Sequence, residues 1–219
     1  MPEAVLFDLD GTLADTAPDL GGALNQLLRE QGHGPLPMEK LRPYVSSGAR
    51  GMIGAGLGIT PVDSAYLELQ QRFLAIYQES LCVGTRLFAG MPQHLDELEA
   101  RGIPWGIVTN KSQRFAIPLM EGLGLRQRAA CIVCGDSAQR AKPHGHPMQL
   151  ASAVIGVAAS DCIYVGDDER DVISGRAVGM KTIVAAWGYL GDGKPPATWG
   201  ADAIAASPQD ILGIAASNR

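Results

Sequence analysis

The sequence predicts an α/β fold: a Rossmann-like, doubly wound parallel sheet with an inserted all-helical domain. The first observation behind this prediction is that short apolar runs alternate with segments of helical periodicity, which is typical of βαβ units. The second observation is that this alternation is interrupted after the first apolar run by a long stretch in which all the patterns are helical. The apolar runs are Ala4–Leu6, Pro104–Val108, Cys131–Val133, Cys162–Val165 and Thr182–Ala185.

The first apolar run is the expected first strand of the core, and the helical stretch follows it. Two amphipathic patterns lie in that stretch, one around Leu24 and one around Phe73. Each repeats its apolar residues every three or four positions, so each is expected to be a helix with one buried face. We therefore predict a helical cap at residues 16–85, inserted into a core made of residues 1–15 and 86–219.

The rest of the chain returns to alternating strands and helices. One helical segment contains Leu95 and Leu98, and another contains Val172 and Ile173. A strand near residues 202–206 and a helix over residues 208–215 are expected to complete the fold. Helical connections between successive strands favour a parallel sheet that is covered on both faces.

Composition and charge narrow the classes of function. Of the 219 residues, 46% are hydrophobic and 19% are charged, and the net charge is −5, which suits a chain that buries a sizeable core. A surface for nucleic acid or anionic membranes would need an excess of basic residues, so neither partner is expected. No targeting segment and no membrane-spanning apolar run is visible, which favours a cytoplasmic location. The expected assembly is a monomer or homodimer.

The first expected strand runs directly into two acids in the stretch VLFDLDGT. Asp8 and Asp10 are two positions apart, so they are expected to project together from the carboxyl end of the strand, where open parallel sheets bind ligands. Two neighbouring carboxylates repel each other unless a cation lies between them, and Mg²⁺ prefers such oxygen ligands. The alternative is a solvated Asp-Gly turn.

Further polar residues lie just past later apolar runs or just before expected helices. Each has a local alternative, namely a helix cap, a surface lysine, or an acidic first turn of a helix. Together, a hydroxyl, an amide, a lysine and a second acidic cluster at one edge of the sheet suit a phosphoryl group held beside Mg²⁺. These residues are Thr109, Asn110, Lys142, Asp167, Asp168 and Asp171.

The segments DLDGT, TN, KP and GDDERD, in this order, resemble the four signature motifs of the haloacid dehalogenase-like (HAD) phosphohydrolases. The resemblance covers the whole chain, and the helical stretch after the first motif is similar to the cap of C1-capped members. Within the superfamily the chain most resembles phosphoglycolate phosphatases and N-acetylmuramic acid 6-phosphate phosphatases, through VSSGARGM, PWGIVTNK, YVGDDERD and GYLGDG. The resemblance implies a phosphatase acting on a small phosphorylated metabolite, and both candidate substrates carry a carboxylate.

The resemblance also implies roles for the acids of the first and last motifs. Asp8 would be the nucleophile that forms an aspartyl-phosphate. Asp10 would protonate the leaving alkoxide and then activate the water that hydrolyses the intermediate. Mg²⁺ would be held by the Asp8 carboxylate, the Asp10 backbone carbonyl and Asp167.

Residues of the later motifs would, by the same resemblance, hold the phosphoryl group and balance its charge. Thr109, together with Asn110, would donate to phosphoryl oxygens, and Lys142 would neutralise the nucleophile and the phosphate. Asp171 would orient the lysine or a metal-bound water, and Asp168 would assist.

Three remaining positions complete the expected site. Gly11 would let the chain turn closely past the metal, and Thr12 would fix Asp10 by a hydrogen bond. In the cap, Arg50 would either reach a substrate carboxylate, which a planar guanidinium suits, or lie exposed on a helix.

Three other functions share parts of this pattern. A haloacid dehalogenase would use the same nucleophile but does not need an acid at position 10. A phosphosugar mutase would have the same motifs and cap and would need a bisphosphate activator. A phospho-acceptor signalling domain also groups Asp, Thr and Lys around Mg²⁺, but it lacks a helical insert after its first strand.

Overall fold

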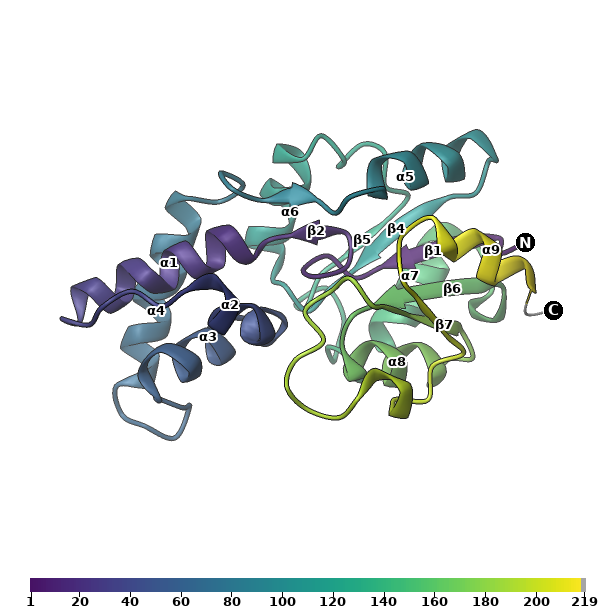
Figure 1. Cartoon of the computed structure of the whole chain (residues 1–219). Helices are drawn as coiled ribbons and strands as arrows, with labels where there is room; N and C mark the ends of the chain where they lie inside the picture. The colour runs from purple at the N-terminus through teal and green to yellow at the C-terminus, as the bar shows by residue number, and fades with distance from the viewer. Residues whose placement is uncertain (218–219) are drawn as a thin grey trace.

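The core of the molecule is a six-stranded sheet in which all neighbouring strands are parallel, as seen in the computed structural model, which describes residues 1–217 (Figure 1). The strand order is β5-β4-β1-β6-β7-β8. Counted along the chain, these strands follow the order 3-2-1-4-5-6 of doubly wound folds, so the predicted α/β sheet is confirmed. The strands are β1 Ala4–Phe7, β4 Trp105–Val108, β5 Ile132–Val133, β6 Cys162–Gly166, β7 Lys181–Ala185 and β8 Ala203–Ala205.

Strand β1 lies at the centre of the sheet, where its register positions the later site. Val5 is paired with Trp105 of β4 on one side and with Ile163 of β6 on the other. All four residues of β1 are buried, as expected for a strand covered on both faces. The strand order reverses beside β1, and the carboxyl ends of strands at such a point form a crevice for ligands.

Helices cover both faces of the sheet, because alternate residues of each strand point to opposite sides. Val5 and Phe7 pack into the core on the face covered by α5, α6 and α9. Ala4 and Leu6 face the opposite way, toward the face that carries α7 and α8 (Figure 1). The helices are α5 Met91–Ala100, α6 Gln113–Gly122, α7 His146–Ile155, α8 Glu169–Arg176 and α9 Asp210–Ser217.

A helical insertion, at the left of Figure 1, lies between the short strands β2 (Ala14–Asp15) and β3 (Arg86–Leu87). These two strands pair antiparallel where the chain leaves and re-enters the core. The insertion has its own apolar core, to which Leu24 and Phe73 contribute, so the two predicted amphipathic helices are confirmed. Its elements are α1 Ala17–Glu30, α2 Met38–Leu41, the 3₁₀ helix η1 Arg42–Ser47, α3 Gly48–Leu57 and α4 Tyr66–Glu79.

The ribbon of β2 and β3 was not expected from the sequence, since strands of two residues carry no periodic pattern. The predicted domain boundaries, residues 16 and 85, are the positions next to this ribbon, and they stay a prediction. Two further 3₁₀ helices, Ala159–Asp161 and Pro196–Thr198, lie in connections of the core.

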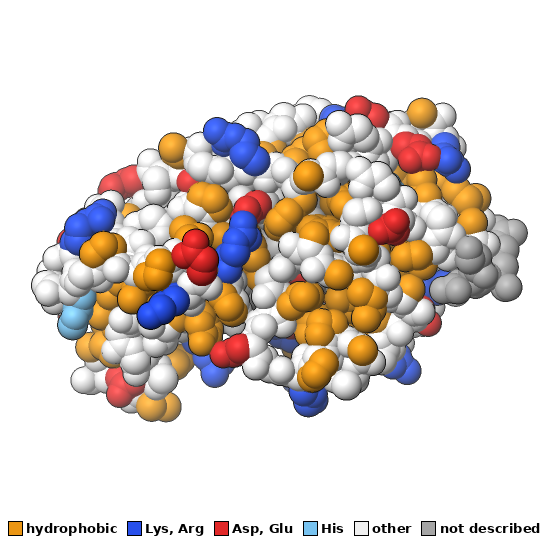
Figure 2. Space-filling model, in the orientation of Figure 1, with side chains coloured by type: hydrophobic (Ala, Val, Ile, Leu, Met, Phe, Trp, Pro, Cys, Tyr) orange, Lys and Arg blue, Asp and Glu red, His pale blue; other side chains and the backbone are white. Residues whose placement is uncertain are grey.

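The face of the molecule drawn in Figure 2 shows no large basic field among the described residues. On the face drawn in Figure 2, Lys and Arg side chains are dispersed and lie among Asp and Glu side chains. Within residues 1–217, none of the helices combines the length and the hydrophobicity that crossing a bilayer requires.

Candidate active site

The site begins where β1 ends. Asp8 follows the last strand residue, and its backbone N–H donates to the carbonyl of Val165 at 2.9 Å, so β6 fixes its position. The chain then turns tightly at Gly11, whose φ is +88°. A Cβ at Gly11 would lie 2.2 Å from Oδ2 of Asp167, so only glycine allows this approach.

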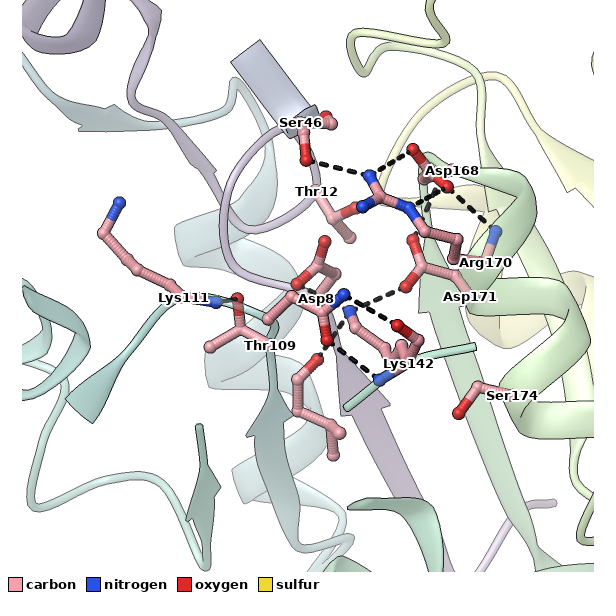
Figure 3. A network of polar contacts seen from close by, with 12 residues as sticks. Asp8, Thr12, Ser46, Thr109, Lys111, Lys142, Asp168, Arg170, Asp171 and Ser174 are labelled. Atoms are coloured by element: carbon pink, nitrogen blue, oxygen red, sulfur yellow. Dashed lines mark hydrogen bonds and ion pairs between the residues drawn. The ribbon is translucent and has the colours of Figure 1, made fainter. Parts of the chain in front are cut away.

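The ammonium group of Lys142 is buried among four oxygens (Figure 3). It lies 2.9 Å from Asp8 Oδ1 and 2.7 Å from Asp171 Oδ1. It also donates to the carbonyl of Val108 at 3.0 Å and to the hydroxyl of Tyr164 at 2.8 Å. Burial alone would lower the pKa of Lys142, but the two carboxylates raise it overall, so the lysine is a fixed positive charge beside Asp8.

Three carboxylates converge at this point. One oxygen of each of Asp8, Asp167 and Asp171 lies within 4.8 Å of the others, and all three residues are buried. Burial, with repulsion from Asp171 and Asp10, raises the pKa of Asp8 to about 6 although Lys142 opposes the shift. Burial and repulsion from Asp8 also raise the pKa of Asp167.

This set of donors fits a hard divalent cation. All the groups are carboxylate oxygens, which Mg²⁺ prefers, and one ammonium group does not balance three buried acids. Asp8 and Asp167 were predicted as ligands from the sequence. The structure adds Asp171 to the group, although one oxygen of that residue is also paired with Lys142.

The side chain of Asp10 belongs to a different set of contacts. Its Oδ1 accepts a hydrogen bond from Thr16 Oγ1 at 2.6 Å and lies 2.9 Å from Nζ of Lys111. The hydroxyl of Thr12, which was expected to fix Asp10, instead donates to Asp167 Oδ1 at 2.8 Å. That expectation about Thr12 is therefore wrong, because the turn at Gly11 directs this hydroxyl toward β6.

Thr109 and Asn110 follow β4 and face the site from its other side. Thr109 is buried, and its backbone N–H donates to Val133 of β5 at 2.9 Å. The amide of Asn110 makes two hydrogen bonds to the backbone of Lys142, accepting from its N–H at 2.9 Å and donating to its carbonyl at 3.0 Å. Asn110 therefore positions the lysine, a contact that the motif alone did not reveal.

Asp168 caps helix α8 and lies in an ion pair. Its Oδ1 accepts from the backbone N–H of Arg170, and Asp171 completes a capping box at the same helix end. Burial would raise the pKa of Asp168, but the guanidinium of Arg170 at 2.7 Å lowers it overall. The acidic cluster therefore divides, with Asp168 serving the helix and Arg170.

Two residues without a predicted role join the insertion to the core (Figure 3). The guanidinium of Arg170 donates to the backbone carbonyl of Ser46 at 2.9 Å, and Ser46 Oγ donates to Asp167 Oδ2 at 3.0 Å. Ser46 belongs to the VSSGARGM stretch, through which the chain resembles the two groups of phosphatases, but its contacts were not predicted.

A cavity of about 300 Å³ opens between these residues and the insertion. Asp8, Asp10 and Lys142 line it from the core, and Ser46 and Tyr77 are among the residues that line it from the insertion. A volume of this size is at the small end of the range for small-molecule sites. The insertion thus covers the acid cluster and leaves room beside it for a ligand.

Arg50 is not among the residues that line this cavity, and it is exposed on α3. Of the two expectations for this residue, the structure has the exposed helical position. Gly11 and Thr12 also lie outside the cavity lining, behind the acid cluster. The structure thus brings Asp8, Asp10, Thr109, Asn110, Lys142, Asp168 and Asp171 to the cavity, with Asp167 beside them.

Comparison with known proteins agrees with this geometry. A family model described as haloacid dehalogenase-like hydrolase matches residues 5–185. The N-acetylmuramic acid 6-phosphate phosphatase of Pseudomonas aeruginosa is 41% identical, over 97% of this chain and 94% of its own length. The phosphoglycolate phosphatase of Xanthomonas campestris pv. campestris is 43% identical, over 96% of this chain and 95% of its own length.

Solved structures share the fold. A haloacid dehalogenase-like hydrolase from Streptococcus pneumoniae superposes with a TM-score of 0.82 at 23% identity, covering 96% of both chains. The six-stranded sheet, the inserted helices and the family match over most of the chain agree with one another. The chain belongs to the haloacid dehalogenase-like hydrolases, as the resemblance predicted.

Proposed function

We propose that this protein is a Mg²⁺-dependent phosphomonoester hydrolase that acts through an aspartyl-phosphate on a small organic phosphate carrying a carboxylate. The observation that carries the proposal is the pairing of Asp8 with the buried ammonium of Lys142 at 2.9 Å, at the floor of the cavity. A buried carboxylate held ionised beside an opening is suited to nucleophilic attack. Its position at the end of the central strand keeps it rigid.

In the first step an oxygen of Asp8 attacks the phosphorus in line with the ester oxygen. The bond between the phosphorus and the ester oxygen breaks as the bond to Asp8 forms. Lys142 lowers the repulsion between the carboxylate and the phosphate dianion. Mg²⁺, held by Asp8 and Asp167 with the Asp10 carbonyl or Asp171, would supply charge neutralisation on the phosphoryl oxygens. Asn110 keeps Lys142 in place through its two backbone contacts.

Asp10 is the proposed general acid and general base. Its carboxyl lines the cavity next to Asp8, so it can protonate the leaving alkoxide and then accept a proton from the water that attacks the aspartyl-phosphate. Thr16 Oγ1 and Lys111 Nζ hold one of its oxygens at 2.6 and 2.9 Å. The other oxygen is therefore the one available for proton transfer.

Thr109 supplies a hydrogen-bond donor to the transferred group. Its Oγ1 accepts from the backbone N–H of Lys111 at 3.2 Å, which leaves the hydroxyl proton free to point into the cavity. Asp168 acts indirectly, because it caps the start of α8. Asp171 holds the ammonium group of Lys142 through its Oδ1.

The substrates named for the relatives guide the substrate class. One relative carries the name of a phosphoglycolate phosphatase and another that of an N-acetylmuramic acid 6-phosphate phosphatase. Both of these molecules are phosphate monoesters that carry a carboxylate. The two names divide relatives of nearly equal identity, so the proposal covers the class that the two substrates share.

The test is phosphate release from 2-phosphoglycolate and from N-acetylmuramic acid 6-phosphate, each with Mg²⁺ and with a chelator. The wild-type protein is expected to hydrolyse at least one of them only with Mg²⁺. Asp8→Asn removes the nucleophile and is expected to abolish release, whereas Asp96→Asn, at an exposed acid of α5, leaves it unchanged. Equal release by wild type and Asp8→Asn, or release without a divalent cation, would contradict the proposal.

A further inference from the structure

Lys111 is a buried cation that the proposed chemistry does not fully use. Its side chain is 8% exposed, and among the described residues its one anionic contact is Asp10 Oδ1 at 2.9 Å. The hydroxyl of Tyr77 lies beside the Lys111 ammonium group as well, and because an ammonium group has three donors, it can still donate to a ligand oxygen. Burying a cation in this state is costly unless a ligand supplies the missing acceptors.

Tyr77 of α4 provides a second group of this kind on the same wall. Its hydroxyl is buried beside the Lys111 ammonium group and donates to no acceptor among residues 1–217, although buried tyrosine hydroxyls usually do. Burial raises the pKa of Tyr77 to about 12 even with Lys111 nearby, so the hydroxyl stays protonated and can donate. Nζ of Lys111 lies 4.7 Å from the centroid of the Tyr77 ring, which also holds the lysine by a cation–π contact.

Both groups line the cavity, and both lie near Asp10, the residue proposed to contact the ester oxygen. Figure 3 shows the Lys111 side chain extending away from Lys142. The ammonium group of Lys142 already has four oxygen neighbours, so it belongs to the phosphoryl position. Lys111 is instead next to Asp10, which would contact the ester oxygen of the substrate.

We propose that Lys111 and Tyr77 bind the carboxylate of the substrate, and that this carboxylate lies one or two carbon atoms from the ester oxygen. The inference rests on the proposed phosphatase function and specifies its substrate as a short 2-phosphoryloxy acid. The short spacing follows from the 2.9 Å between Lys111 Nζ and Asp10 Oδ1. Because Asp10 would contact the ester oxygen, a carboxylate bound by Lys111 must lie close to that oxygen. A carboxylate accepts from the ammonium and the hydroxyl together, which satisfies both groups.

Arg50, one of whose two expected positions was against the substrate carboxylate, is exposed and lies outside the cavity lining. The cation that can meet a substrate carboxylate without rearrangement of the insertion is therefore Lys111. The carboxylate of a phosphorylated N-acetyl sugar acid would lie farther from its ester oxygen and would not reach the same subsite.

The experiment compares two ligands that differ by the carboxylate, 2-phosphoglycolate and ethyl phosphate. Binding is measured by titration calorimetry with Mg²⁺ in an Asp8→Asn background, where hydrolysis does not interfere. Adding Lys111→Met is expected to weaken 2-phosphoglycolate binding by about 50-fold, the range for a charged hydrogen bond, and to change ethyl phosphate binding less than about threefold. Lys40→Met, at an exposed lysine of α2, is the charge-matched control.

A second variant guards against a folding defect. Tyr77→Phe removes only the hydroxyl, and it is expected to weaken 2-phosphoglycolate binding by about fivefold while ethyl phosphate binding is unchanged. Circular dichroism and the thermal midpoint confirm that each variant is folded. N-acetylmuramic acid 6-phosphate is titrated in parallel, and Lys111→Met is expected to change its binding less than about threefold.

The outcomes separate this inference from the proposed function. Equal losses for both small ligands on Lys111→Met would mean that the lysine acts through Asp10 alone, and would overturn the inference. So would a loss of 2-phosphoglycolate binding on Arg50→Met, or a larger Lys111→Met effect with the sugar phosphate. Carboxylate-selective binding by a wild-type protein that releases no phosphate would refute the hydrolase and leave the subsite standing.

Discussion

Replacing the proposed nucleophile is expected to stabilise the metal-free protein at neutral pH. Asp8 is buried beside two other acids, and burial is the main reason why its pKa rises from 3.8 to about 6. The charged form is therefore less favourable in the folded state than in the unfolded state. Asp8→Asn keeps the shape of the side chain and removes the charge, so it removes this cost.

The size of the effect follows from the pKa difference. A rise of about 2 units corresponds to roughly 3 kcal/mol at pH 7, where Asp8 is charged in both states. Because the folded pKa is raised, the cost is absent below about pH 4 and is complete once the pH has passed the folded value near 6. The stabilisation by Asp8→Asn is therefore expected to be about 3 kcal/mol at pH 7 and about 1.5 kcal/mol at pH 5.

The assay is urea unfolding of wild type and Asp8→Asn in a metal chelator at both pH values. Taking the difference between the two proteins removes the contribution of all other titrating groups. Adding Mg²⁺ is expected to stabilise the wild type more than the variant, because the ion binds the folded state through the missing carboxylate. A variant that is less stable than wild type without metal at pH 7, or a difference that does not shrink at pH 5, would refute the reasoning.

Three further predictions concern buried polar groups. Lys142→Met should abolish phosphate release and lower the free energy of unfolding in the presence of Mg²⁺ by about 3 kcal/mol; retained turnover would contradict the role of this lysine. Tyr189→Phe removes a hydroxyl that accepts from the backbone N–H groups of Thr16 and Ala17 at 2.8 and 2.9 Å, and should cost about 1–3 kcal/mol in denaturant unfolding. Burial lowers the pKa of His94 from 6.5 to about 4, so the free energy of unfolding should fall as the pH drops below 6.5. His94→Leu should flatten this pH dependence, and an unchanged slope would exclude His94 as its source.

The sheet and the inserted helices could be predicted because burial imposes a repeating pattern on them. A strand covered on both faces, such as β1, appears as a continuous apolar run. Helices α1 and α4 bury one face each, so their apolar residues recur every three or four positions. The β2–β3 ribbon buries too few residues for such a pattern and was missed.

The identity of the core site residues was also accessible, but their partners were not. Asp8 and Asp10 follow β1, Lys142 lies in the loop before α7, and the sheet topology brings these segments together. Whether a hydroxyl contacts Asp10 or Asp167 depends on the exact course of the turn after β1. Thr12 and Thr16 are both threonines near these acids, and the sequence pattern does not distinguish their directions.

The cation that faces the substrate could not be identified from the sequence either, and the reason differs between Arg50 on a helix and Lys111 on a loop. Residues Ser47 to Ala49 line the cavity, but each step along a helix rotates the side chain by about 100°, and Arg50 lies exposed. Lys111 follows Thr109 by two positions, and the cavity closes over it because Tyr77 packs against it from the insertion. A cation is buried there by contact between two segments far apart in the chain. The sequence of neither segment alone indicates that contact. Sequence motifs can therefore predict the phosphoryl site, whereas the carboxylate subsite depends on how the insertion packs against the core.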